Sequence, residues 1–207
     1  PAWSVTPPNN PEAVQAIADN LIANDYHIGT ALEFILTSDF FKEAVFAKVK
    51  NPTEVVIGTL RLVGNTERPS PDTMQWATDI TNMGQDLLNP PSVEGWHSGI
   101  EWINSGTLMK RTNFTAELIS DRSRPGVTSI LDHVMAAGNS PEALVDACLD
   151  IMGPSEIAPE SRLELIEHAT ALAQENTNGN GSKNQDSIST ISEILQLIVS
   201  LREFQFA

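Results

Sequence analysis

The sequence predicts an all-α fold, a multi-helix domain of orthogonal or bundle-like packing that carries one long, ordered loop rich in Pro, Gly and Trp. Apolar residues recur at helical spacing in one segment after another. Several segments open with a capping side chain, a proline and an acid, which together mark a helix start. No two segments alternate apolar and polar residues as paired strands do. We therefore expect roughly eight to ten helices around one core.

The first half of the chain contains five segments of this kind. Asn10 and Asn51 each stand before a proline with an acid close behind, as at the start of a helix. The β-branched run at 55–57 would suit a strand, but its surroundings are helical and it has no partner strand. We therefore expect a buried helix there. The five expected helices lie at about 10–22, 28–36, 40–46, 52–63 and 74–87.

The second half continues the pattern and adds a hint of an internal repeat. Residues 140–143 read SPEA and nearly repeat the NPEA of residues 10–13. Similar helical modules near 10–47 and 140–207 are expected to flank a central segment, 48–125, within a single domain that spans 1–207. The polar, glycine-rich residues 176–185 are expected to form a linker. The remaining expected helices lie at about 108–120, 127–137, 141–152, 159–172 and 188–206.

Composition and charge exclude some classes of partner. The 207 residues carry a formal net charge of −15, which argues against nucleic acid and anionic membrane surfaces, since both need clustered Lys and Arg. No apolar run approaches the ~20 residues of a membrane helix, so we expect no direct membrane span. The single cysteine, Cys148, excludes a disulfide within the chain and is expected to be a buried thiol. No signal peptide is visible, and the sequence starts at Pro1 rather than at Met, which suggests a processed mature form or a fragment of something longer.

Residues 83–114 form the stretch around which the rest is organised. A helix is expected to break at Asn89-Pro90-Pro91, because proline cannot continue a helix and restricts the residue before it. A glycine-punctuated loop with Trp96 and Trp102 follows, and a helix resumes near Ser105. Two indoles within a few residues are large apolar anchors. We therefore expect an ordered loop that is clamped between two helices.

The same loop supplies the candidate ligand-binding residues. Aromatic faces stack on sugar rings while amides donate and accept oriented hydrogen bonds, so this set would suit a glycan. The competing interpretation, which we favour, is that the indoles hold the loop against the helices. The candidate ligand-binding residues are Trp96, Trp102, Asn89, Asn104, Glu94 and His97.

Metal, cofactor and catalytic motifs are not predicted. Glu94, His97 and Glu101 include types of side chain that bind zinc or manganese, but their spacing matches no metal motif, and an exposed acidic loop is the favoured interpretation. The asparagine-rich residues 176–181 lack the acid that a calcium loop needs. No serine lies in a nucleophile elbow and no glycine loop has phosphate-binding spacing. We expect no cofactor, no metal and no catalytic residue.

Several blocks resemble a known bacterial family, domain of unknown function 1800. Residues 48–61 resemble its K-x-K-S-P-x-E-F-V-x-x-x-x-R motif, and residues 84–91 resemble its G-Q-x-L-x-x-P-P signature, which Gly95 and Trp96 follow. Residues 108–114 resemble its L-x-x-R-x-N-F segment. Residues 201–205 resemble its S-P-E-F-Q ending, with Leu201 and Arg202 where Ser and Pro are usual. The structural motif residues are Lys50, Pro52, Glu54, Arg61, Gly84, Gln85, Pro90, Pro91, Gly95 and Arg111, and an internal ion network of Lys50, Glu54 and Arg61 is expected to position its helix.

The resemblance implies that this chain corresponds to the C-terminal part of a longer protein, and that the protein is periplasmic, on the cell surface or secreted. The family has no established activity, so no catalytic residue is carried over. Two functions remain open. One is a non-catalytic binding or scaffolding module, part of an exported protein or a subunit of a larger assembly, with other protein chains as partners. The other is a hydrolase of an extracellular polymer, or a carbohydrate-binding domain, that uses the Trp96 and Trp102 loop with Glu94 and Glu101.

Overall fold

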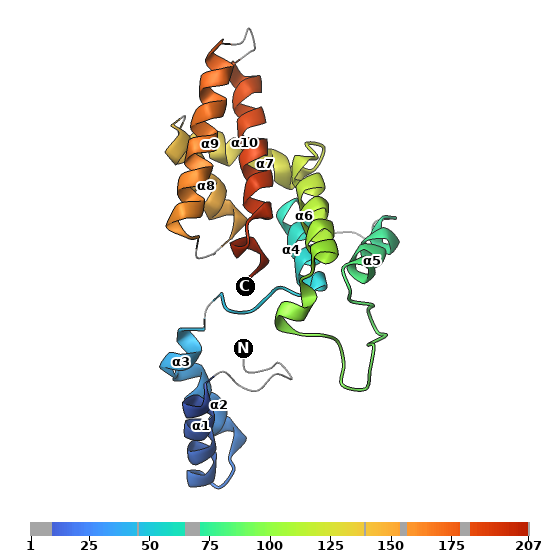
Figure 1. Cartoon of the computed structure of the whole chain (residues 1–207), viewed down its shortest axis with the longest axis vertical. Coiled ribbons are helices and arrows are strands. Elements are labelled where there is room, and N and C mark those ends of the chain that lie inside the picture. The colour runs from blue at the N-terminus through green and yellow to red at the C-terminus, as the bar shows by residue number, and fades with distance from the viewer. Residues whose placement is uncertain are drawn as a thin grey trace.

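The computed structural model describes residues 10–44, 46–64, 71–138, 140–153, 157–178 and 183–206, with the backbone alone at 175–178 and 183–186. Within these ranges it contains ten α-helices and two short 3-10 helices. β pairing in the described residues is limited to two isolated bridges, Val49 with Phe206 and Ser92 with Gly95. The prediction of an all-α, multi-helix fold is confirmed (Figure 1).

The first three helices form a small unit of their own. These are α1 (Pro11–Ala23), α2 (Ile28–Thr37) and α3 (Asp39–Lys42). The Asn10 side chain accepts a hydrogen bond from the Ala13 N–H at 3.0 Å, which is the predicted cap. The unit projects away from the other helices (Figure 1), and Ala31 is its one buried residue among those described. The helix expected at 40–46 is wrong in length, because α3 ends at Lys42 and Phe46 adopts a positive φ of 58°.

The core lies mainly among six of the helices that follow. They are α4 (Pro52–Leu62), α6 (Ser105–Ser120), α7 (Pro125–Ala137), α8 (Pro141–Met152), α9 (Pro159–Asn178) and α10 (Lys183–Ser200). Helix α10 is central and packs against α6, α7, α8 and α9 (Figure 1). Its apolar residues recur at helical spacing on one face, as a core-facing helix requires. Those on this face are almost completely buried: Ile191, Ile194, Leu195, Ile198 and Val199.

Helix α4 confirms that the β-branched run is helical. Val55 and Val56 are buried while Ile57 is exposed, so the run presents one face to the core. The end of α4 meets the start of α7 backbone to backbone, where the Gly126 N–H donates to the Val63 carbonyl at 2.9 Å. A Cβ at Gly126 would lie 2.3 Å from the Val63 carbonyl carbon, so this approach requires glycine.

Several other predicted boundaries differ from the structure. The helix expected at 188–206 ends at Ser200, and a short 3-10 helix follows it. Helix α5 (Thr73–Asn82) ends well before residue 87, because Gly84 adopts a φ of 106° and the Gln85 N–H turns back to the Ile80 carbonyl at 3.1 Å. Helices α9 and α10 reach into the expected linker at 176–185, and residues 179–182 lie outside the described residues. Between the helices expected at 52–63 and 74–87, residues 65–70 lie outside the described residues.

None of the helices in the described residues combines the length and the apolar composition needed to cross a membrane. The expected internal repeat stays a prediction. The surroundings of its two parts differ, since α8, α9 and α10 pack into the core while α1, α2 and α3 pack mainly on one another.

Candidate functional site

The residues after α10 return to the start of α4 and pair with it. Val49 and Phe206 form an antiparallel bridge, and the Lys50 N–H donates to the Gln205 carbonyl at 2.8 Å. The Lys50 Nζ donates to the Phe204 carbonyl at 2.8 Å and lies 4.5 Å from the centre of the Phe204 ring. This short segment, η2 (Glu203–Gln205), is therefore held by backbone, ammonium and cation–π contacts to one lysine.

Arg111 reaches the same point from α6. Its side chain is fully buried, and Nη1 donates to the Lys50 carbonyl at 2.7 Å. Burial lowers the pKa of the Arg111 guanidinium and of the Lys50 ammonium, and the charge of Glu54 acts in the opposite direction on both. Arg111 Nε and Nη2 have no hydrogen-bond partner among the described residues. Lys50 and Arg111 are thus two partly desolvated cations, and each donates a hydrogen bond to a backbone carbonyl of another segment.

Glu54 and Gln85 complete the first turn of α4. The Asn51 side chain accepts from the Glu54 N–H at 2.9 Å, while Glu54 Oε2 accepts from the Asn51 N–H at 2.8 Å, which forms a capping box. Glu54 Oε1 also pairs with Lys48. Gln85 Oε1 accepts from both the N–H of Thr53 at 3.0 Å and its Oγ1 at 2.7 Å. We call Lys50, Asn51, Glu54, Gln85, Arg111 and Gln205 the α4 junction.

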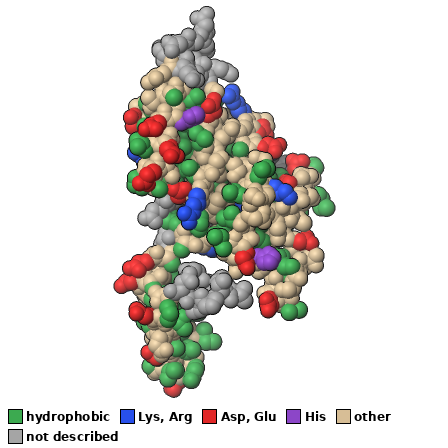
Figure 2. All heavy atoms as spheres, in the orientation of Figure 1, with side chains coloured by type: hydrophobic (Ala, Val, Ile, Leu, Met, Phe, Trp, Pro, Cys, Tyr) green, Lys and Arg blue, Asp and Glu red, His purple; other side chains and the backbone are tan. Residues whose placement is uncertain are grey.

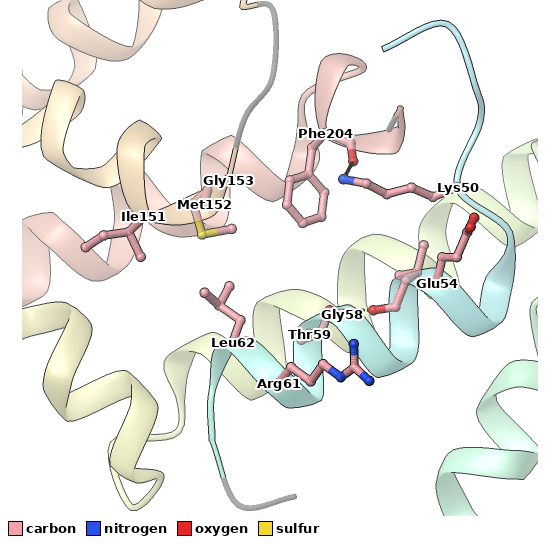
Figure 3. Close-up of a pocket in the computed structure, with 11 residues that line it drawn as sticks. Lys50, Glu54, Gly58, Thr59, Arg61, Leu62, Ile151, Met152, Gly153 and Phe204 are labelled. Carbon is pink, nitrogen blue, oxygen red and sulfur yellow. Dashed lines mark hydrogen bonds between the residues drawn. The ribbon is translucent and has the colours of Figure 1, made fainter. Parts of the chain in front are cut away.

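A groove runs beside the α4 junction. It has a volume of about 410 Å³ and lies between α4, the end of α8 and Phe204 (Figure 3). Leu62, Ile151 and Met152 give it apolar walls, and Lys50 and Arg61 add charge. Gly58 adds no side chain to the part of α4 that lines the groove. The space beside it is open, because a Cβ at this position would meet no atom within 4 Å. The groove therefore has an apolar surface with few polar groups.

Arg61 does not belong to the α4 junction. It is exposed, lies two turns further along α4 than Glu54, and forms no ion pair with a described residue. The expected network of Lys50, Glu54 and Arg61 is therefore corrected: Arg111 takes the place of Arg61. Spacing along one helix suggested Arg61, whereas the structure supplies the buried cation from a different helix.

Glu203 ties the same C-terminal segment to the start of α9. Its Oε1 accepts from Ser161 Oγ at 2.9 Å and from the Ala158 N–H at 3.3 Å. Desolvation acts to raise the pKa of Glu203, but hydrogen bonds from its own backbone, Ser161 and Ala158, with the charge of Arg202, outweigh it. The pKa of Glu203 is therefore held below its ordinary value.

The two loop tryptophans occupy different environments. Trp102 lies in η1 (Gly99–Trp102) with 5% of its surface exposed, and its carbonyl accepts from Thr107 Oγ1 at 2.9 Å. Trp96 is half-buried, and its Nε1–H donates to the Asp86 carbonyl at 3.0 Å. Trp102 has no free face for a sugar ring. The two indoles therefore hold the loop in place and do not form a shared stacking surface.

The polar candidates of the loop are also engaged in local contacts. The Asn104 side chain caps α6 by accepting from the N–H groups of Gly106 and Thr107 at 3.0 and 2.9 Å. Asn89 Nδ2 donates to Asp86 Oδ2 at 2.8 Å. His97 lies 3.7 Å from Glu101, and the loop carboxylate at position 94 is exposed. In the described part of the chain, no three His, Cys, Asp or Glu residues are placed to hold a metal ion.

The remaining motif residues shape the loop. Pro90 and Pro91 are exposed and follow Leu88, which has a positive φ of 64° and is 96% exposed. Gly84 and Gly95 both adopt the left-handed region that favours glycine. Pro52 is buried at the first position of α4. These residues fix backbone direction and leave no side chain free for chemistry.

The first three helices carry an exposed apolar surface that was not predicted from the sequence. α1, α2 and α3 expose large apolar side chains that helical spacing alone would assign to a core. Figure 2 shows hydrophobic side chains gathered over this unit, with carboxylates along one margin. The apolar stripes are visible in the sequence, but their exposure is not: among the described residues, no other element buries them. We call these residues the α1–α3 face: Val14, Ile22, Tyr26, Ile28, Leu32, Leu36 and Phe41, which are between 45% and 70% exposed.

Comparison with known proteins then places the chain. A family described as "Protein of unknown function (DUF1800)" matches residues 2–206. The chain belongs to this family. No curated protein and no solved structure matches it. In this member of the DUF1800 family, all four motif blocks meet at the α4 junction, at Lys50 and Glu54, Gln85, Arg111 and Gln205.

Proposed function

We propose that the chain is a non-catalytic binding module, and that it docks another protein on the α1–α3 face. The observation that carries this proposal is the exposure of the face. Seven large apolar side chains lie within α1, α2, α3 and the turn between α1 and α2, and all remain at least 45% exposed. Large apolar side chains that gather on the surface of one unit are typical of a protein interaction site (Figure 2).

The α4 junction supports a structural role for the family motifs. Lys50 is engaged by the Phe204 carbonyl and ring, Glu54 by the α4 cap and Lys48, and Arg111 by the Lys50 carbonyl. A catalytic acid, base or nucleophile must be free to act on a substrate, whereas Lys50 and Arg111 each donate to a backbone carbonyl and Glu54 accepts from the cap of α4. Cys148 is fully buried, and desolvation raises its pKa to about 12, which is the opposite of an activated thiol.

The proposed setting is an exported bacterial protein, located in the periplasm, on the cell surface or outside the cell. This part rests on the resemblance to the family, whose members commonly carry export signals. A module in such a protein would act as a scaffold by holding a second chain. A glycan ligand is not proposed, because the Trp102 ring has no free face.

The test is capture of a partner from the extracytoplasmic fraction of a bacterium that carries this protein. Immobilised wild-type protein is expected to retain one partner in stoichiometric amount. The variant Ile28→Ser, Leu32→Ser, Leu36→Ser is expected to lose it, because it replaces exposed residues and leaves the core intact. Val93→Ser is the matched control, since Val93 is fully exposed in the loop outside the face. Equal retention by all three proteins would contradict the proposal.

A further inference from the structure

We infer that the partner of the α1–α3 face is an amphipathic helix whose apolar stripe is flanked by Lys and Arg. This inference rests on the proposed function and specifies the chemistry of the partner. It follows from two independent features of α1, α2 and α3, namely the spacing of their exposed apolar residues and the sign of the charges around them.

The spacing of the exposed residues is that of a helix-binding surface. On α2, Ile28, Leu32 and Leu36 recur every four residues, so they line one side of the helix. On α1, Val14 and Ile22 are eight residues apart and also share one side. α1 and α2 pack against each other as a hairpin. Two such stripes on neighbouring helices suit a third helix that inserts apolar residues at the same spacing.

The charges around the face select a basic partner. Residues 10–44 contain six carboxylates against one lysine, and all seven of these side chains are exposed. Lys42 lies 3.7 Å from Asp39, so it offsets a carboxylate of the same unit. The other acids form no ion pair with a described residue. They are Glu12, Asp19, Asp25, Glu33 and Glu43.

This acidic surround disfavours the other occupants. A second copy of the chain would bring the same carboxylates to the interface, and like charges in juxtaposition cost affinity. An anionic membrane surface would be repelled for the same reason. A helix with basic flanks gains both apolar burial and charge complementarity, and the net charge of −15 would speed its association.

The experiment uses synthetic helices as probes. Two fluorescein-labelled, 18-residue peptides share one leucine stripe with i, i+3, i+4 and i+7 spacing. One carries Lys and Arg beside the stripe, and the other carries Glu at the same positions. Binding to the full chain is measured by fluorescence anisotropy at low and high salt. We expect the basic peptide to bind at least about tenfold more tightly than the acidic one, with an affinity that falls as salt rises.

Variants of the protein locate the binding surface. Leu32→Ser is expected to weaken binding of the basic peptide by about tenfold or more, since a buried leucine contributes about 1.5–3 kcal/mol, or roughly 10–150-fold in affinity. Glu12→Gln with Glu33→Gln is expected to weaken it severalfold and to reduce its salt dependence. Val93→Ser is expected to change nothing. Circular dichroism of each variant verifies that its helix content is unchanged.

Each other outcome counts against the inference in a distinguishable way. Equal binding of the two peptides would contradict the prediction that the partner is basic, but it would not contradict docking at the α1–α3 face. Absence of binding, while the triple serine variant still loses the captured partner, would overturn the helical partner alone. A dimer in sedimentation analysis that Leu32→Ser dissociates would assign the face to a second copy. Binding to vesicles of phosphatidylcholine that Leu32→Ser removes would assign it to lipid.

Discussion

Replacement of Trp102 by alanine is expected to destabilise the protein strongly. Trp102 is 5% exposed, and its ring lies edge-on to the His97 ring with a centroid distance of 6.2 Å. Truncation of a buried tryptophan to alanine costs about 3–5 kcal/mol, from lost apolar burial and from the cavity left behind. This is a large part of the ~5–15 kcal/mol by which a domain is stable. With an m value of about 2 kcal/mol/M, the urea midpoint should fall by about 1.5–2.5 M.

Trp96 provides the matched comparison within the same loop. Because Trp96 is half-buried, Trp96→Ala should lose only part of the apolar contribution, together with the hydrogen bond to Asp86, which contributes about 0.5–1.5 kcal/mol. We expect a loss of about 1–3 kcal/mol for Trp96→Ala. Trp96→Phe keeps an aromatic ring and removes the Nε1–H with part of the apolar surface, so its cost is an upper bound on the contribution of the hydrogen bond.

The assay is urea unfolding followed by circular dichroism at 222 nm, with the midpoint and the m value fitted for each variant. A cost for Trp96→Ala equal to or greater than that for Trp102→Ala would refute this assignment of the two environments. So would a Trp102→Ala variant that keeps the midpoint of the wild type. A sugar-binding screen run beside the urea titrations is expected to give no binding that depends on Trp102.

Three other expectations concern single residues. Gln85→Ala removes the acceptor of two hydrogen bonds from Thr53 and should cost about 1–3 kcal/mol in the same urea titration, whereas no loss would contradict its role at the start of α4. Cys148 should not react with Ellman's reagent at pH 8 until urea unfolds the protein, because burial raises its pKa to about 12, and fast reaction of native protein would contradict this. Glu203 has a folded-state pKa below the ordinary 4.5, so its ionised form stabilises the fold above that value and the contribution is lost as the pH falls through the folded-state pKa. Glu203→Gln should therefore be less stable than the wild type at pH 7 and converge with it in acid, whereas a pH-independent difference would argue against this linkage.

Local signals predicted most of the helices. The caps at Asn10, Asn51 and Ser140 act on residues within one turn, so the sequence is enough to identify them. The end of α5 was missed because Leu87 continues the apolar spacing beyond the residues that remain helical. Gly84, with its positive φ, ends the helix first. Periodicity records which residues are apolar, whereas a single backbone conformation decides where the helix stops.

The α4 junction and the α1–α3 face were beyond such signals for different reasons. Lys50 and Phe204 are 154 residues apart, and nothing in either segment specifies the other as its partner. Arg111 stands in a polar part of its helix, so burial could not be read from its neighbours in sequence. The exposure of Leu32 and Leu36 depends on how α2 is placed relative to the core. The tertiary arrangement determines the Lys50–Phe204 contact, the burial of Arg111 and the exposure of α2. The spacing of apolar residues within one segment does not indicate that arrangement.

The pairing of Lys50 with the segment after α10 has a consequence for the order of folding. A ribosome adds roughly 5–20 residues per second, so about 8–30 s pass between synthesis of Lys50 and of its partner 154 residues later. During that interval α4 and α6 can form helices, but Lys50 lacks the Phe204 carbonyl and ring and the Gln205 carbonyl that contact it in the folded protein. The Lys50 ammonium therefore stays hydrated until the segment after α10 has been synthesised and has docked. Completion of the α4 junction is a late event in folding during synthesis.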